Sequence, residues 1–268
     1  MGSAQARAVR RRTVQVRGSR FAIELAEAGS GPPLLVLHDL HARRLWAPYL
    51  DRLAERHQVI APAHPGFAGS TGLDQIDDPI DMAVFYNDLL DELGIDSAAV
   101  LGHELGGMFA AELAAMSPAR VRKLVLVAPL GLRAEGVEAV DIFAGDPAAI
   151  AGLLWHDPVS AEALDFDALP ADPGARQEET ILRARAYASA SRFVWPFPER
   201  GLRKRIHRVK APALVIWGSS DRFTPPALAT PFLESLTGSK LVAIAGAGHF
   251  PMYEQPEAFH SAVSAFLD

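Results

Sequence analysis

Short apolar runs alternate with helical patterns along most of the chain. Continuous apolar runs at residues 33–38, 98–102 and 122–129 are typical of strands that are covered on both faces of a sheet. The pattern predicts further strands at 13–16, 21–26, 57–62, 211–218 and 239–248, and helices at 44–56, 81–93 and 104–116. Because strands and helices alternate between residues 81 and 127, we expect an α/β fold with a mostly parallel sheet and right-handed crossovers.

Residues 131–204 interrupt this alternation. They contain short helical pieces, no strong strand pattern and several breaks at Asp-Pro pairs. A long insertion between two sheet strands often serves as a binding lid. We therefore predict a core formed by residues 1–130 and 205–268, with a helical cap at residues 131–204.

A glycine-bracketed turn, "GHELGG" at residues 102–107, leads from one predicted strand directly into a helix. Its glycines permit a tight turn that holds Glu104 at the carboxyl end of the sheet, where open α/β sheets bind ligands. Asp221 in "WGSSDRFTPP" and His249 in "AGAGHFPMYEQPE" follow later strands. Elbow residue, acid and histidine stand in the chain order of the α/β-hydrolase triad.

The chain resembles the α/β-hydrolase superfamily from about Phe21 to Leu267. The resemblance is to its cap-bearing members, which include small esterases, meta-cleavage-product hydrolases, epoxide hydrolases and haloalkane dehalogenases. It is carried by the elbow together with "LLVLHD", "VIAPAHPGFAGST", "LVIWGSSDRFTPP" and "GAGHFPMYEQPEAF". It implies that Asp221 orients His249, that His249 is the base, and that the backbone N–H groups of Leu40 and Leu105 form the oxyanion hole.

The sequence departs from the family pattern around the predicted site. Glu104 stands where most of the family's esterases have a serine, and Asp39 stands in the oxyanion loop where a glycine is usual. Several departures around one pocket favour natural divergence over a single engineered change. Ser70, Ser219 and Ser220 are poor substitutes for the missing serine, because none of them lies on a strand-to-helix turn.

Glu104 leaves three roles open. As a nucleophile it suits a saturated carbon better than an ester carbonyl, because attack on an ester would give a high-energy anhydride. As a general base it would hold a water or abstract a substrate proton. As neither, it would mark a binding protein. We expect carboxylate-assisted hydrolysis of a small, mostly apolar substrate by Glu104, His249 and Asp221, with a lyase, a cyclase or a binding protein as the alternatives.

The expected substrate pocket gathers residues from several loops and from the cap. Its members are Asp39, His38, His103, Trp155, Tyr187, Trp195 and Phe250. The histidines near this edge (His38, His64 and His103) lack paired carboxylates at ligand spacing, so we predict no metal and no cofactor. The remaining histidines are interpreted as surface or structural residues: His41, His57, His156, His207 and His260.

Composition limits the partners. A net charge of −6 gives no reason to expect nucleic acid or an anionic membrane. The absence of cysteine excludes disulfides and thiolate chemistry. Four arginines near the N-terminus (Arg7, Arg10, Arg11 and Arg12) are interpreted as a solvated arm. Without an apolar leader or a membrane-length apolar run, the chain is expected to be cytoplasmic, a monomer or homodimer acting on a small molecule.

Overall fold

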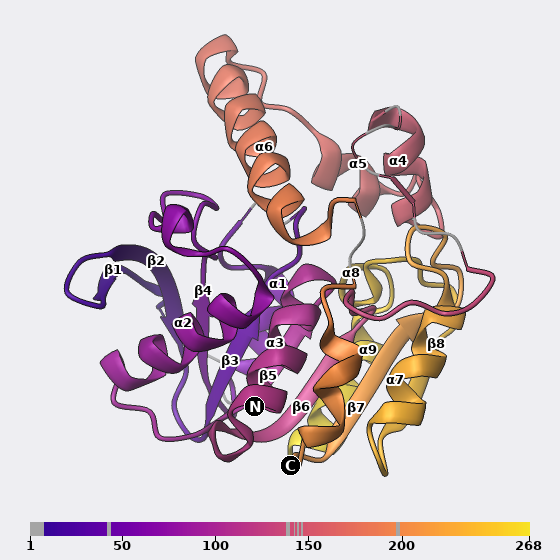
Figure 1. The fold of residues 1–268 in the computed structure, drawn as a ribbon. Helices are drawn as coiled ribbons and strands as arrows, with labels where there is room; N and C mark the ends of the chain where they lie inside the picture. Colours follow the sequence, from indigo (N-terminus) through magenta and orange to yellow (C-terminus); the bar gives the residue numbers. More distant parts are fainter. Residues whose placement is uncertain are drawn as a thin grey trace, which may run out of the picture.

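The computed structural model describes residues 8–41, 44–137, 140, 141, 143, 145, 147–196 and 199–268. Eight strands form one sheet in the order β1-β2-β4-β3-β5-β6-β7-β8, with helices on both faces (Figure 1). The strands are β1 Arg10–Val16, β2 Phe21–Ala28, β3 Pro33–Leu37, β4 Gln58–Pro62, β5 Ala98–His103, β6 Val121–Val127, β7 Ala213–Gly218 and β8 Lys240–Ile244. The predicted α/β architecture is confirmed.

The sheet is parallel from β4 through β8 and antiparallel only at β1 and β2. In the parallel part, Leu37 pairs with Gly102, and His103 pairs with Val127. The carboxyl ends of β3, β5 and β6 therefore finish at nearly the same level. Loops that follow these strands meet at one edge of the sheet, and the site is built there.

Helices pack an apolar core onto each face of the sheet. The flanking helices are α1 Pro48–Leu53, α2 Pro79–Glu92, α3 Leu105–Met116, α7 Ala229–Ser235, α8 Pro251–Glu254 and α9 Pro256–Leu267. One core includes residues of α2 and α3, and the other includes residues of α1 and α9. Helix α3 is buried along nearly its whole length, because small residues at its start allow it to lie close to the sheet.

Three helices lie in the segment that interrupts the strand–helix alternation. They are α4 Pro147–Leu154, α5 Ala161–Asp167 and α6 Pro173–Val194, and two 3₁₀ turns, Leu202–Lys204 and Ile206–Arg208, lead back to β7. Figure 1 shows them beyond the carboxyl edge of the sheet, with α6 projecting from the body. The described residues of this segment form no strand, as expected. Its role as a lid stays a prediction.

The N-terminal arginines differ from expectation. Arg10, Arg11 and Arg12 lie inside β1 rather than in a solvated arm, and Arg7 lies outside the described residues. Arg12 Nε donates to Glu27 Oε1 at 3.1 Å, and Arg10 also pairs with Glu27. The antiparallel register brings these charges together across the strands. Periodicity could not reveal this pairing, because the partner glutamate lies on another strand.

Two further differences concern helices. The helix expected over residues 44–56 is reduced to α1, because Pro48 occupies its first turn and lacks the N–H that an earlier turn would need. The C-terminal helix α9 was not anticipated, although Pro256 at its start and an apolar stripe along it are typical signals. No helix among the described residues has the length and apolarity that a bilayer crossing needs.

Candidate active site

Glu104 occupies a sharp turn between β5 and α3. Its backbone has φ 51° and ψ −109°, a conformation that residues with a side chain seldom adopt. A Cβ at Gly102 would lie 2.3 Å from Gly106 O, and one at Gly106 would lie 2.2 Å from Leu37 O. The turn therefore needs both glycines. The Glu104 N–H donates to Val127 O at 2.9 Å, which fixes the turn onto the sheet.

The Glu104 carboxylate is fully buried and its two oxygens differ. Oε2 accepts a hydrogen bond from the Leu40 backbone N–H at 2.8 Å. Oε1 has no hydrogen-bond partner among the described residues. Burial raises the pKa of Glu104 to about 7; His249 and the N–H groups of Leu40 and Leu105 oppose that rise, whereas Asp39 adds to it. Glu104 is thus a half-satisfied carboxylate that titrates near neutral pH.

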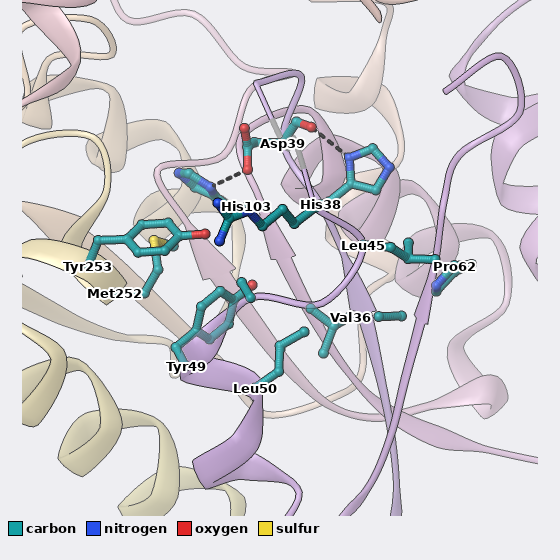
Figure 2. A pocket seen from close by; sticks show the side chains of 13 residues that line it. Val36, His38, Asp39, Leu45, Tyr49, Leu50, Pro62, His103, Met252 and Tyr253 are labelled. Carbon is teal, nitrogen blue, oxygen red and sulfur yellow. Dashed lines mark hydrogen bonds and ion pairs between the residues drawn. The ribbon is translucent and has the colours of Figure 1, made fainter. Parts of the chain in front are cut away.

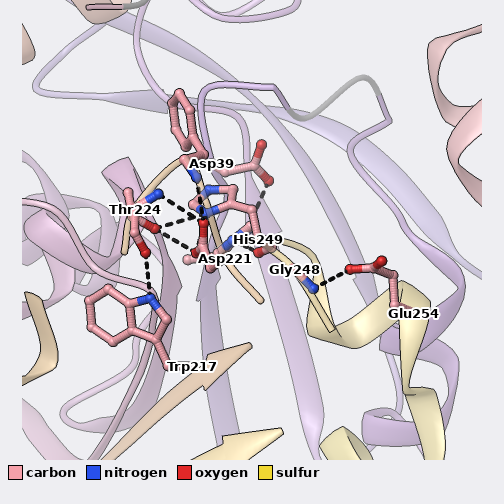
Figure 3. Close-up of polar contacts among 9 residues, drawn as sticks. Asp39, Trp217, Asp221, Thr224, Gly248, His249 and Glu254 are labelled. Atoms are coloured by element: carbon pink, nitrogen blue, oxygen red, sulfur yellow. Dashed lines mark hydrogen bonds and ion pairs between the residues drawn. The ribbon is translucent and has the colours of Figure 1, made fainter. Parts of the chain in front are cut away.

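His249 is held by a hydrogen-bonded acid on the next loop. His249 Nδ1 lies 2.9 Å from Asp221 Oδ2 (Figure 3). Asp221 Oδ1 accepts the N–H groups of Phe223 and Thr224 at 3.0 and 2.8 Å, so the acid is fixed by its own turn. Thr224 Oγ1 donates to Asp221 Oδ2 at 2.6 Å and lies 3.0 Å from His249 Nδ1.

The environment of His249 raises the pKa of its imidazole above the ordinary value. Burial alone would lower the pKa of His249, but the charge and hydrogen bond of Asp221, together with Glu104 and Asp39, raise it. Its Nε2 is buried and has no hydrogen-bond partner in the described part of the chain. With Nδ1 committed to Asp221, Nε2 is the atom that is available for proton transfer.

The loop carrying His249 is anchored from both sides. The Gly248 N–H donates to Glu254 Oε2 at 2.6 Å (Figure 3), and the His249 N–H donates to Leu154 O at 2.7 Å. Leu154 ends α4, so the backbone of the expected cap touches the loop that carries His249 directly. A movement of α4 would therefore displace the backbone of His249.

Asp39 is near the site but does not hydrogen-bond to Glu104. Its Oδ1 accepts the His41 N–H at 2.7 Å, and its Oδ2 lies 3.2 Å from His103 Nδ1 (Figure 2). Burial would raise the pKa of Asp39, but the hydrogen bond with His103 and the nearby histidines bring it well below its usual range. The carboxylate faces a cavity of about 30 Å³ that His103, Tyr49 and Tyr253 also line.

His38 and His64 brace the oxyanion loop against the neighbouring loop. His64 Nε2 donates to His38 O at 2.8 Å, and the His64 backbone N–H donates to His38 Nε2 at 3.1 Å. His38 Nδ1 donates to Asp39 O at 2.6 Å. Among the described residues no group of three or more His, Cys, Asp or Glu side chains could hold a metal ion.

The aromatic residues of the expected pocket lie in different surroundings. Phe250 packs beside His249, with ring centroids 5.3 Å apart, and Trp155 packs on Phe250 at 5.0 Å. Tyr187 on α6 places its hydroxyl 3.1 Å from His41 Nδ1. Trp195 is 55% exposed at the end of α6, and its assignment to the pocket stays a prediction. The residue follows the last turn of the helix, where its side chain is open to solvent.

The alternative serines are engaged away from His249. Ser70 Oγ donates to Ala63 O at 3.1 Å and accepts the Glu24 N–H at 3.0 Å. Ser220 Oγ lies 2.8 Å from His156 Nδ1. These contacts support the view that the elbow residue is the one that faces the histidine.

Two residues of the site were not predicted from the sequence. His41, interpreted as surface or structural, is only 6% exposed and its ring lies 6.4 Å from that of His249. Thr224 joins the acid and the histidine. The signal for Thr224 was a hydroxyl three residues after the acid in "DRFT". His41 had no such signal, because its position depends on how the loop after β3 folds back.

Comparisons with known proteins agree with this architecture. A family described as the alpha/beta hydrolase fold matches residues 32–256. The chain is 31% identical over 91% of its length to the polyketide synthase ThaQ of Burkholderia thailandensis, and spans 12% of that protein. It is 26% identical to a 2-hydroxy-6-oxo-6-phenylhexa-2,4-dienoate hydrolase of Burkholderia cepacia, covering 95% of this chain and 94% of that protein.

A solved structure shares the fold. A bacterial membrane phospholipase A superposes with a TM-score of 0.81 at 24% identity, covering 97% of this chain and 86% of that one. The family match spans most of the sheet, the elbow and the histidine loop. The chain belongs to the α/β-hydrolase fold family.

Proposed function

We propose that the protein is a hydrolase of small, mostly apolar organic molecules in which the Glu104 carboxylate attacks a saturated carbon that carries a leaving group. His249, oriented by Asp221, then hydrolyses the resulting ester. The observation that supports this proposal is the unequal environment of the two Glu104 oxygens. Oε2 accepts the Leu40 N–H, whereas the buried Oε1 has no partner among the described residues.

The first step needs one free carboxylate oxygen. A lone pair of Oε1 forms a bond to the substrate carbon, and the leaving group departs with the electron pair of the bond that breaks. Glu104 becomes an ester whose carbonyl oxygen is Oε2. That oxygen already lies 2.8 Å from the Leu40 N–H, so the ester forms with its carbonyl in place.

The second step uses the free nitrogen of His249. Water gives a proton to Nε2 and attacks Cδ of the Glu104 ester. Negative charge develops on Oε2, where the Leu40 N–H stabilises it. When the intermediate collapses, the product alkoxide leaves and takes the proton from Nε2. The product is an alcohol, and Glu104, which is left as the carboxylic acid, releases its proton to solvent to restore the carboxylate.

A second candidate is general-base catalysis by Glu104. Burial raises the pKa of Glu104 to about 7, which suits a base that works near neutral pH. In this route Glu104 takes a proton from water or from a substrate C–H bond, and no covalent intermediate forms. The 2-hydroxy-6-oxo dienoates named for two relatives have no saturated carbon that carries a leaving group, so a substrate of that kind would favour the base route.

A single turnover in ¹⁸O-labelled water separates the two routes. The enzyme is used in excess over an alkyl halide, epoxide or ester that it converts. The nucleophilic route then puts the label into the Glu104 side chain and none into the first product. The base route labels the product at once. Peptide mass spectrometry locates the label, and Glu104→Gln is the matched control for background exchange.

A trapped intermediate provides an independent test. His249→Gln keeps a neutral, hydrogen-bonding side chain but cannot accept the water proton. In the nucleophilic route this variant accumulates a substrate adduct on Glu104, seen as a mass increase equal to the substrate without its leaving group. If all substrate classes leave Glu104 unmodified and unlabelled, the nucleophilic proposal is refuted.

A further inference from the structure

His103 and Asp39 form a second buried acid–histidine pair beside Asp221 and His249. The His103 and His249 rings have centroids 4.8 Å apart. His103 Nε2 lies 2.9 Å from His249 O, and His103 Nδ1 lies 3.2 Å from Asp39 Oδ2. Both residues are nearly inaccessible to solvent. The proposed reaction uses neither of them, although an acid in the oxyanion loop is unusual for this site.

The partners of His103 determine how many protons it holds. A backbone carbonyl can only accept, so Nε2 must carry a hydrogen to bond with His249 O. A neutral imidazole has one N–H, and Nδ1 would then present a lone pair to Asp39 Oδ2. An ionised Asp39 can also only accept. Two acceptors would face each other at 3.2 Å unless a proton lies between them.

The neighbouring histidines do not have this conflict. His38 donates through Nδ1 to Asp39 O and accepts the His64 N–H at Nε2. His64 donates through Nε2 to His38 O, and its Nδ1 can accept the hydroxyl of Tyr86. Each is fully satisfied as a neutral imidazole. Of these three, His103 alone has two partners that both accept.

We propose that His103 and Asp39 share one additional proton at neutral pH, held as a His103 imidazolium against the Asp39 carboxylate. The pair is then electrically neutral, and His103 is a positioning residue that weakens the effect of the Asp39 charge on Glu104. This explains how the oxyanion loop can carry the Asp39 carboxylate although a second carboxylate, that of Glu104, lies in the same site. The proton count does not depend on the reaction, but its effect on activity rests on the proposed role of Glu104.

The surroundings of the pair act on its proton in opposite directions. Burial brings the pKa of the His103 ring below its ordinary value, although the hydrogen bond and the charge of Asp39 raise it. The assignment therefore rests on the two acceptors that face the two ring nitrogens. Removing the proton from the pair would leave a buried carboxylate facing a lone pair, so burial also resists deprotonation of the pair as a whole. The charged or titratable groups around it are His38 and His41 on the Asp39 loop, Tyr49, Tyr253, Arg44, His249 and Glu104.

Imidazole ¹⁵N NMR of the native protein tests the proton count directly. We expect both ring nitrogens of His103 to be protonated from pH 7 to about pH 8, while His38 and His64 in the same spectrum each show one N–H. If His103 has one N–H and Asp39 is protonated, the pair still holds the additional proton, but the proton lies on the carboxyl group and not on the imidazole. A singly protonated His103 beside an ionised Asp39 overturns the proposal.

Asp39→Asn identifies the partner. The asparagine amide can donate to Nδ1, so His103 should become neutral in this variant. If His103 remains doubly protonated, Asp39 is not the counter-ion and the proposal fails. Should the variant not fold, the native spectrum still decides the proton count.

His103→Gln tests the effect on Glu104. Glutamine can still donate one hydrogen bond but carries no charge, so Asp39 would act on Glu104 unopposed. We expect the acidic limb of the pH–rate profile to move up by about one pH unit, with the exposed His207→Gln as the unchanged control. An unmoved limb together with an imidazolium in the native spectrum would leave the shared proton intact and refute its coupling to Glu104.

Discussion

Glu104 Oε2 lies 2.8 Å from the backbone nitrogen of Leu40, the donor that the family resemblance assigns to the oxyanion hole. With a serine at this position, the donor would be open to the carbonyl oxygen of a substrate. Here the protein's own carboxylate occupies it. A site arranged in this way is better prepared to stabilise charge on an ester of Glu104 than charge on a substrate carbonyl.

The raised pKa of Glu104 makes the stability of the fold depend on pH. The folded protein holds this proton up to about pH 7, whereas the ordinary value is 4.5. Protonation therefore contributes stability that is complete below pH 4.5 and is lost as the pH rises through 7. Glu104→Gln removes this dependence. We expect the variant to be more stable than the native protein at pH 8, by up to about 3 kcal/mol, and similar at pH 4.5.

Urea denaturation of both proteins across this pH range measures the difference. The carboxamide oxygen of glutamine can still accept the Leu40 N–H, so the comparison isolates the charge. Equal stability at all pH values would mean that Glu104 ionises at its ordinary pKa. A greater gain at pH 4.5 than at pH 8 would give the pH dependence the opposite sign.

The length of the elbow side chain should matter as much as its charge. Glu104→Asp keeps a carboxylate but withdraws it by one methylene, so it cannot both accept the Leu40 N–H and reach the same carbon. Displacement of a reacting group by about 1 Å can cost roughly 100-fold in rate. We expect kcat to fall by about that factor while KM changes little. A fully active aspartate variant would contradict the role assigned to the Leu40 contact.

Much of the sheet could be predicted from the sequence, because buried parallel strands are continuous apolar runs. The elbow was also predictable, since Gly102 and Gly106 flank a residue between a strand and a helix. The bounds of two helices were harder to predict from the sequence. Pro48 shortens α1, and α9 depends on the apolar face that the sheet offers it.

The direction of side chains at the site could not be predicted from the sequence. Asp39 stands one residue before Leu40, the donor to Glu104, yet its carboxylate turns to His103 and the His41 N–H. His41 lies beside His249, with its N–H on Asp39 Oδ1, because the loop after β3 folds back. Trp195 is exposed because it follows the last turn of α6. Such choices depend on contacts between loops that are far apart in the chain.

The elbow glycines provide a test of the fold around the site. Gly106→Ala would place a methyl group 2.2 Å from Leu37 O, so strand β3 and helix α3 would have to separate. We expect a loss of at least about 3 kcal/mol in the free energy of unfolding. Gly152→Ala on α4 is the matched control, because a Cβ there meets nothing within 4 Å. The control should gain about 0.5–1 kcal/mol from the helical preference of alanine.

Thermal and urea unfolding of both variants check this prediction. If Gly106→Ala is as stable as the native protein, the close approach of α3 to β3 is overestimated. The turn conformation of Glu104 would then depend less on its neighbours than the structure indicates.

Replacing Glu104 by serine should restore ester chemistry. In Glu104→Ser, the Leu40 and Leu105 N–H groups become free to bind a substrate oxyanion, and His249 Nε2 remains oriented by Asp221. We expect the rate on activated esters such as p-nitrophenyl acetate to rise at least about 100-fold over the native protein, the size of a general-base or oxyanion contribution.

The controls for the serine variant separate nucleophilic catalysis from a merely opened pocket. Glu104→Ala opens the same space without a nucleophile and should show no gain. Adding His249→Gln to Glu104→Ser should remove the gain, because the serine then lacks its base. Asp39→Gly in the serine background should add little, since Asp39 already faces His103 and the His41 N–H rather than residue 104. If activity appears only in that double variant, the charge of Asp39 reaches the oxyanion position and its pairing with His103 does not contain it. If neither variant is active, the substrate pocket rather than residue 104 is what has diverged from the esterases.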